Sequence, residues 1–174
     1  MKYEFVAGDE ITTPWGVKLK RIRALVAITA LGVASGDLGG YLESEKNLST
    51  AGNAWVYGNA RVYGDALVSG DARVYGDAWV SGDARVYGDA WVSGDAWVYG
   101  DKLIFWASKV GRDNGTLTVF NSKDNTLTVT RGCFIGSIDE FLAKSEKEHD
   151  DQTHIEYRML IDVAYSRITR AQIN

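Results

Sequence analysis

Few residues in this sequence are suited to acid–base, nucleophilic or metal-assisted chemistry. Histidine is the side chain that exchanges protons most readily near neutral pH, and the sequence has two, His149 and His154, on either side of Asp150-Asp151. Cys133 is the single cysteine and has no histidine close to it in sequence, so we expect a small buried side chain in a strand-to-helix connection. We therefore expect no catalytic residue, no metal site and no cofactor, with both histidines exposed to solvent.

Tryptophan, tyrosine and arginine form a larger set of distinctive residues, and they recur within a six-residue repeat. The unit is Gly-(Asp/Asn)-Ala-x-Val-(Tyr/Ser), which runs eight times without a break from Gly52 to Tyr99, with a degraded ninth unit over 100–105. Six is a multiple of the two-residue side-chain period of a strand, so Ala and Val point to one side and x and Tyr/Ser to the other. Glycine and Asp or Asn suit corners. The repeat predicts a triangular solenoid with about 18 residues per coil and about 4.8 Å between coils.

This repeat resembles that of the hexapeptide-repeat, left-handed β-helix proteins. The six-residue step can be continued upstream through Leu42 and Leu48, which we place at the Ala position of the unit. The predicted fold is mainly β, with a left-handed parallel β-helix (hexapeptide solenoid) over residues 36–105. Segments within Arg21–Ser49 resemble the entry region of uncharacterised β-helix proteins encoded in enterobacterial and phage genomes. The segments Thr130–Phe134 and Glu140-Phe141 resemble a module found in phage-encoded proteins. That resemblance implies a phage or prophage type of protein, but it carries no agreed activity.

The open ends of a solenoid need protection, because unpaired strand edges invite aggregation. Residues 1–35 predict an N-terminal β cap, with strands at 3–6 and 15–25 around a turn that contains Pro14.

Residues 106–174 predict a small C-terminal ββαα domain. Alternating apolar residues indicate strands over 116–120 and 126–130, joined by a hairpin loop at 121–125. Two capping boxes, one at Ser137–Glu140 and one at Thr153–Glu156, predict helices that run to about residues 147 and 171.

Composition limits the classes of ligand and compartment. The net charge is −4 with a pI near 5.2, which argues against nucleic acid as the main ligand, because phosphate-binding surfaces cluster Lys and Arg. The longest apolar stretch, 24–34, is shorter than the roughly 20 residues that a membrane-spanning helix needs. The start of the chain has no apolar run of the signal-peptide type. We therefore expect a cytoplasmic protein that binds neither nucleic acid nor membrane, and the resemblance to phage-encoded proteins implies a bacterial host cell.

The family resemblance raises one enzymatic alternative, because the best-known hexapeptide β-helix proteins are acyltransferases that use a histidine on or beside the helix as general base. Here the repeats contain no histidine. The related β-helical carbonic anhydrases take three histidines at zinc, and this chain has two. We expect the protein not to be an enzyme, and acyltransferase-like activity is kept as an alternative.

The corner residues predict three stacked columns of Asp and Asn along the solenoid. With about 18 residues per coil, the columns are Asn53, Asp71 and Asp89; Asn59, Asp77 and Asp95; and Asp65, Asp83 and Asp101. An anionic array could collect cations or imitate a nucleic-acid backbone. We favour turn chemistry, in which the carboxylates accept backbone N–H bonds, because arginines are interspersed among these acids.

The outward positions carry the predicted protein-binding surface. Aromatic and arginine side chains on an exposed face mark interfaces, and the candidate residues are Trp55, Arg61, Tyr63, Arg73, Trp79, Trp91, Trp97 and Tyr99. The predicted function is non-catalytic binding of a protein, with a host defence protein as the target that phage origin suggests. The alternatives are a homo-oligomeric structural scaffold and the acyltransferase-like enzyme. We also expect self-association, with a trimer as the arrangement that the hexapeptide resemblance implies.

Overall fold

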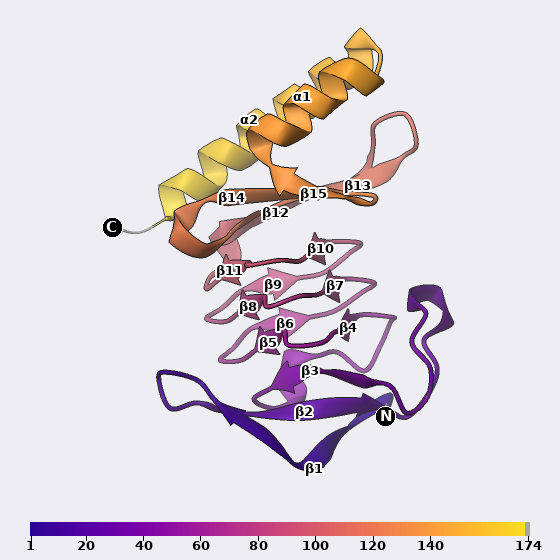
Figure 1. Cartoon of the computed structure of the whole chain (residues 1–174), viewed down its shortest axis with the longest axis vertical. Helices are drawn as coiled ribbons and strands as arrows, with labels where there is room; N and C mark the ends of the chain where they lie inside the picture. Colours follow the sequence, from indigo (N-terminus) through magenta and orange to yellow (C-terminus); the bar gives the residue numbers. More distant parts are fainter. Residues whose placement is uncertain (173–174) are drawn as a thin grey trace.

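The computed structural model describes residues 1–172, which form a parallel β-solenoid between an N-terminal hairpin and a C-terminal sheet that carries two helices (Figure 1). Eight two-residue strands make up the solenoid, and they are β4 (Trp55–Val56), β5 (Arg61–Val62), β6 (Leu67–Val68), β7 (Arg73–Val74), β8 (Trp79–Val80), β9 (Arg85–Val86), β10 (Trp91–Val92) and β11 (Trp97–Val98). Parallel pairing stacks β5, β8 and β11 on one face, β4, β7 and β10 on a second, and β6 and β9 on a third. The predicted repeat fold is confirmed.

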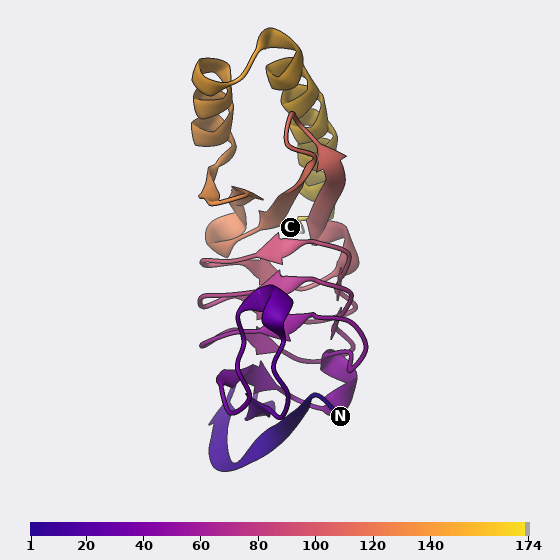
Figure 2. The same cartoon turned by 90° about the vertical axis from the view of Figure 1, so that its right-hand side faces the viewer.

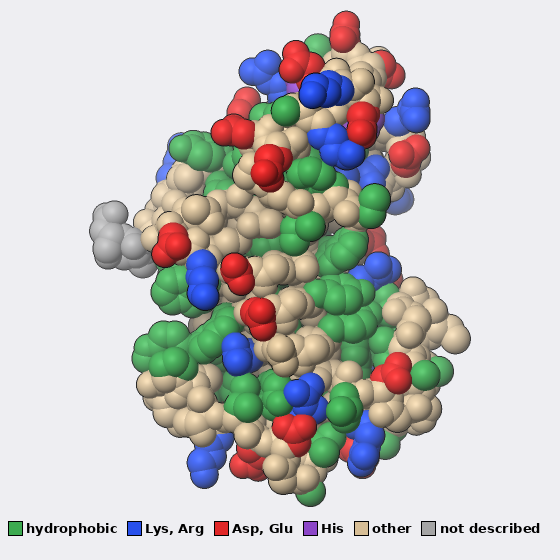
Figure 3. Space-filling model, viewed as in Figure 1, with side chains coloured by type: hydrophobic (Ala, Val, Ile, Leu, Met, Phe, Trp, Pro, Cys, Tyr) green, Lys and Arg blue, Asp and Glu red, His purple; other side chains and the backbone are tan. Residues whose placement is uncertain are grey.

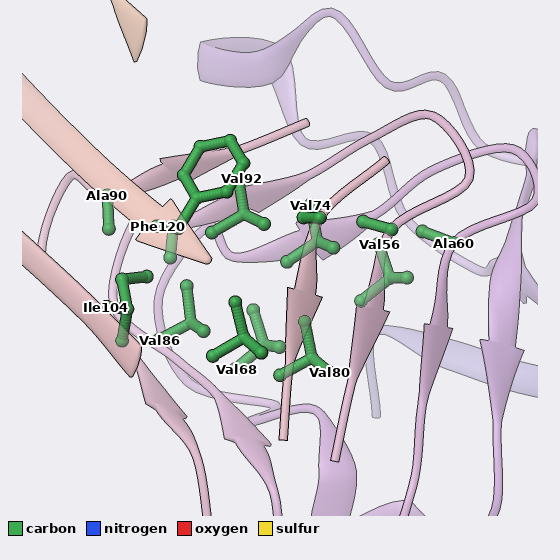
Figure 4. Packing of buried hydrophobic residues seen from close by; sticks show 14 of the residues in the cluster. Val56, Ala60, Val68, Val74, Val80, Val86, Ala90, Val92, Ile104 and Phe120 are labelled. Atoms are coloured by element: carbon green, nitrogen blue, oxygen red, sulfur yellow. The ribbon is translucent and has the colours of Figure 1, made fainter. Parts of the chain in front are cut away.

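The interior of the solenoid consists of the Ala and Val side chains of the repeats. Every one of them between Ala54 and Val98 is at most 1% exposed. In Figure 4, Val74 and Val92, which are paired on one face of the solenoid, and Val80, on another face, all extend into the same narrow interior. Their burial confirms the inward assignment of Ala and Val, whose small and β-branched side chains suit a narrow interior.

The corners need glycine for two reasons, which Gly76 illustrates. Its φ is +67°, a conformation that side chains other than glycine seldom adopt. A Cβ built on it would also lie 2.9 Å from the amide N of Gly94 in the coil above. Close stacking of corners thus excludes a methyl group even where the backbone conformation could be tolerated.

The N-terminal cap closes the lower end with β1 (Tyr3–Thr12), β2 (Lys18–Ala24) and β3 (Leu38–Leu42). The two antiparallel strands β1 and β2 continue through β3 into the sheet of β5, β8 and β11, which agrees with the predicted strands and turn. Side chains from the cap bind carbonyl groups that the lowest coil leaves unpaired. The Nζ of Lys2 donates to the carbonyl of Ala54 at 2.8 Å in this way, and within the cap Nη1 of Arg21 donates to the carbonyl of Gly39 in β3 at 2.8 Å.

The predicted register upstream of the repeats is wrong. Leu42 pairs with Val62, and Leu48 bridges to Val68, so both leucines occupy the Val position rather than the Ala position. The reason lies in the turn after Leu48, since the step from Leu48 to the next inward residue of this kind, Val56, is eight residues instead of six. This longer corner shifts the first coil by two residues.

The upper end is closed by an antiparallel sheet of β12 (Ile104–Val110), β13 (Gly115–Asn121), β14 (Leu127–Arg131) and β15 (Phe134–Ser137). The sequence predicted two of these strands and the hairpin loop after Asn121. It assigned Ile104 and Phe105 to a ninth repeat, but Ile104 pairs with Phe120 of β13 in antiparallel register. Phe120 is fully buried and lies above Val92 in Figure 4, so the new sheet plugs the solenoid.

Helices α1 (Ile138–Glu148) and α2 (Asp151–Ala171) pack on this sheet at the end remote from the N-terminus (Figures 1 and 2). The capping box of Ser137 and Glu140 is confirmed at α1. The second box is wrong, because Asp150 is the N-cap of α2 and its carboxylate accepts from the amide of Thr153. No helix within the described chain has the length and apolar character needed to cross a bilayer.

Candidate functional site

Strand pairing aligns the outward side chains in the two predicted columns. Arg61 pairs with Trp79, and Trp79 pairs with Trp97, along one face. Arg73 lies between Trp55 and Trp91 on another. The 18-residue coil therefore brings together residues that the sequence predicted to be stacked, at the strand spacing of about 4.8 Å.

Trp79 is the centre of the first column, and three side chains from two parts of the chain contact it. Trp15, from the turn between β1 and β2, meets its ring edge-on with 5.5 Å between centroids and an interplanar angle of 86°. The guanidinium of Arg61 lies 4.7 Å from its centroid, within cation–π range. Tyr63 approaches at 6.1 Å, and burial raises the pKa of Tyr63, an effect that its hydrogen bond to Ser81 opposes. Trp79 is thereby fixed in orientation while one part of its surface stays exposed.

A groove of about 420 Å³ opens beside Trp79 on this face. Its floor is the solenoid, one wall is the N-terminal hairpin that carries Trp15, and the other is the turn η4 (Lys123–Asn125) of the C-terminal sheet. The residues that line it are Trp15, Arg61, Asp77, Trp79, Asp95, Ala96, Trp97 and Lys123. We call this the indole groove, because three of its eight lining residues are tryptophans.

Charges of both signs surround the indoles. Asp77 and Asp95 are stacked corner residues with exposed side chains, and neither forms an ion pair within residues 1–172. The backbone amide of Lys123 donates to the carbonyl of Asp95 at 3.0 Å, which fixes the upper wall against the top corner. Apolar rings with a charged rim are the composition of a protein-binding site. Figure 3 shows hydrophobic side chains gathered over the solenoid with isolated charges among them.

The second column is covered at its lower end by the chain itself. Trp55 was predicted to be exposed and to bind a partner, but it is 1% exposed. Tyr3 of β1 packs against it at 6.4 Å between ring centroids, so the N-terminal cap occupies this surface and Trp55 is a core residue. Further up, the rings of Tyr57 and Tyr75 stack at 3.9 Å, and Tyr75 contacts Trp91 at 5.6 Å.

Arg73 and Trp91 are half-buried, and Trp91 lies beneath β13. Its backbone amide donates to the Oγ1 of Thr118 at 3.1 Å, and the Oγ1 of Thr130 donates to its carbonyl at 2.6 Å. Its indole Nε1 is buried without a hydrogen-bond partner among the described residues. Trp91 therefore joins the solenoid to its upper cap, and the first column is the more open of the two.

Tyr99 and Tyr63 belong to the predicted site as well, and both stay near the first column. Tyr99 contacts Trp97 at 5.3 Å between centroids. The sequence missed Trp15, which belongs to the groove although 64 positions separate it from Trp79. Its signal in the sequence was a tryptophan directly after Pro14 in a predicted turn, but no local pattern could show which face that turn would reach.

Side chains in two of the three corner columns form hydrogen bonds that join successive turns. Asn53 donates from its side-chain amide to Asp71 at 2.8 Å, and the carboxylate of Asp83 accepts from the backbone amide of Asp101 at 3.1 Å. These bonds join corners one coil apart and agree with the interpretation as turn chemistry. Within residues 1–172, no group of three or more His, Cys, Asp and Glu side chains is placed to hold a metal ion.

His149 is the C-cap of α1 and His154 lies in the first turn of α2, and both contact one serine. Both were expected to be exposed, but they are half-buried. The Nδ1 atoms of His149 and His154 lie 3.0 and 3.2 Å from the Oγ of Ser145, which is itself buried. This cluster joins the end of α1 to the start of α2, and it shares no residue with the indole groove. Cys133 was expected to be buried before a helix, but it is exposed in the turn between β14 and β15.

The comparisons with known proteins identify the repeat. A family model described as YdcK beta solenoid repeat matches residues 54–70, 66–82 and 84–100. Comparison with curated proteins gave no match. The matched segments coincide with the stacked strands β4 to β11, so this chain is a β-solenoid repeat protein.

Proposed function

We propose that this protein is a non-catalytic binding protein that holds a partner protein in the indole groove. The observation that carries the proposal is the meeting of Trp15, Trp79 and Trp97 along one groove, although they come from two separate regions of the chain. Trp15 is exposed and the other two are half-buried, and a partly exposed cluster of tryptophans is typical of a surface that a partner covers.

The construction of the groove favours a protein as the partner. Tryptophan and arginine contribute most to protein–protein affinity when they lie in a partly desolvated centre. Trp79 and Trp97 stand on paired strands, and a rigid backbone loses little conformational entropy on association. The free carboxylates of Asp77 and Asp95 beside Arg61 and Lys123 offer charged contacts of both signs at the rim. Such contacts set orientation and association rate more than affinity.

The absence of catalysis is part of the proposal, and it rests on which residues line the groove. Neither histidine nor cysteine is among them, so proton transfer at neutral pH and thiol chemistry have no obvious carrier there. A measured turnover of acetyl-CoA that disappears in His149→Ala or His154→Ala would contradict this part of the proposal.

The partner class follows from the resemblance of the segments around the solenoid to phage-encoded proteins. We propose a host protein of the bacterial cytoplasm, such as a defence component, as the target. A structural scaffold made of copies of this chain is the second candidate.

Affinity capture from a bacterial lysate tests the proposal when variants of the groove are compared with the unaltered chain. Trp79→Ser with Trp97→Ser removes two indoles, and Trp15→Ser removes an exposed one with little effect on the core. Tyr87→Ser is the matched control, because Tyr87 is an exposed aromatic residue on the third face. We expect one protein to be captured by the unaltered chain and by the control, and to be lost from both groove variants. Equal capture by all four proteins, with unchanged circular dichroism, would place the partner site elsewhere.

A further inference from the structure

Helix α2 has a second apolar face that its own chain does not cover. Ile155, Met159 and Val163 follow one another at four-residue intervals, and they are 54, 58 and 48% exposed. With 100° between successive residues, Met159 points roughly opposite to the buried face of α2, which includes Tyr157 and Ile161. We call the three exposed residues the outer stripe. One apolar stripe binds the helix to its sheet, so a second stripe has no role within the chain.

The outer stripe faces away from the rest of the molecule. Figure 2 shows α2 at the margin, with α1 and the sheet on its inner side. The stripe shares no residue with the indole groove, and the two surfaces belong to different parts of the fold.

Two charged residues beside the outer stripe have a pattern that fits a second copy of the same helix. Arg158 and Asp162 are both exposed, lie on the same side of the stripe, and form no ion pair within residues 1–172. They are four residues apart, but a basic residue that precedes an acidic one is the weaker order for a pair within a helix.

When two antiparallel helices are related by a two-fold axis perpendicular to them, residues that flank the outer stripe on one side lie opposite the residues that flank it on the same side in the second copy. An axis near Leu160 places Arg158 of each copy opposite Asp162 of the second copy, which makes two ion pairs. Because this axis is also close to Met159, the centre of the outer stripe, it places the outer stripes of the two copies in contact. It also brings the acidic first turn at Asp151 beside the basic last turn at Arg170, so the two helix dipoles oppose each other favourably.

We propose that this chain forms a homodimer through antiparallel contact of α2 with α2 of a second copy. The helix has 21 residues and is about 31 Å long, and three apolar side chains make a small interface. We expect a weak dimer, with a dissociation constant on the order of micromolar. The outer stripe shares no residue with the indole groove, so variants of the two surfaces test dimerisation and partner binding separately.

Sedimentation velocity of the full chain over a range of concentrations tests the dimer. We expect a monomer–dimer equilibrium that Met159→Asp weakens by about tenfold or more, because the substitution places a carboxylate at the centre of both stripes. Val26→Asp is the control, since Val26 is similarly exposed but lies near the N-terminal cap. A chain that stays monomeric at all concentrations, or a trimer that Met159→Asp leaves unchanged, would overturn the proposal.

Charge reversal tests the antiparallel geometry itself. Arg158→Asp or Asp162→Arg alone sets like charges opposite each other and should weaken the dimer several-fold. Both substitutions together restore opposite charges and should recover the dimerisation constant to within about twofold of the unaltered chain. A double variant that dimerises no better than either single one would refute the antiparallel pairing, provided that circular dichroism shows equal helix content in all variants.

Discussion

The close stacking of the glycine corners can be tested by adding a methyl group at either of two corners, only one of which has another corner stacked closely against it. Gly58 and Gly76 both have positive φ, +56° and +67°. A Cβ on Gly58 would meet nothing within 4 Å, whereas a Cβ on Gly76 would lie 2.9 and 3.2 Å from the N and O atoms of Gly94. Replacing each with alanine therefore separates the cost of backbone conformation from the cost of steric overlap.

The expected magnitudes follow from these two contributions. An alanine in the left-handed region costs about 1–2 kcal/mol, and a less flexible unfolded chain offsets about 0.4–1 kcal/mol of it. Gly58→Ala should thus lower the free energy of unfolding by about 1 kcal/mol. Gly76→Ala adds overpacking against Gly94, which costs about 1–3 kcal/mol more, because the neighbouring corner is itself stacked and can move little.

Urea denaturation followed by tryptophan fluorescence measures the difference. For a denaturant dependence of about 2 kcal/mol per molar, the midpoint of Gly76→Ala should lie about 1 M below that of Gly58→Ala. Equal midpoints for the two variants would show that adjacent corners are not in contact, and the stacking derived from the structure would be refuted.

Three further predictions concern the core and the N-terminal cap. Val74→Asp should prevent folding, since it places an unpaired carboxylate in the Ala/Val interior, and a soluble variant with an unchanged melting temperature would contradict the inward assignment. Burial lowers the pKa of Lys2 to about 8 and raises that of Tyr3 to about 12. Between about pH 8 and 10.5, Lys2 is protonated in the unfolded chain and not in the folded one, so the free energy of unfolding should rise with pH there. Above pH 10, Tyr3 is ionised in the unfolded chain and not in the folded one, so the free energy of unfolding should fall with pH. Lys2→Met should abolish the rise, as measured by urea titrations at different pH. Trp55→Ala should destabilise the protein by about 3–5 kcal/mol, whereas Trp97→Ala should change the melting temperature little, and equal shifts would argue against the burial of Trp55.

The solenoid could be predicted from the sequence because its repeat leaves one consistent register. Alternation of inward Ala and Val with outward residues, closed by Gly-Asp corners, fixes both the faces and the 18-residue coil. Prediction failed where the six-residue spacing of apolar residues continued but the strand pairing no longer followed the repeat. Ile104 continues the six-residue step but pairs with Phe120, and Leu42 follows the step while the longer corner after Leu48 shifts the coil.

The stacking of the outward side chains in columns could be predicted from the sequence, but the residues of the N-terminal cap that pack on these columns could not. Strand register alone places Trp79 beside Trp97. The contacts of Tyr3 with Trp55 and of Trp15 with Trp79 join residues more than 50 positions apart, and no local spacing predicts them. The exposure of Cys133 had a usable signal, because Gly132 and Cys133 form a two-residue connection between strands, with φ of +57° at Gly132, which is a hairpin signature.

Hydroxyl-radical footprinting of the chain alone and in the complex captured from lysate tests the binding proposal most directly. The method measures, by mass spectrometry, how fast each aromatic side chain is oxidised by radicals from the solvent. We predict that oxidation of Trp15, Trp79 and Trp97 falls on partner binding, while that of Tyr87 on the third face stays the same. Unchanged oxidation of the three tryptophans in a complex that is fully bound would contradict the assignment of the indole groove as the binding site.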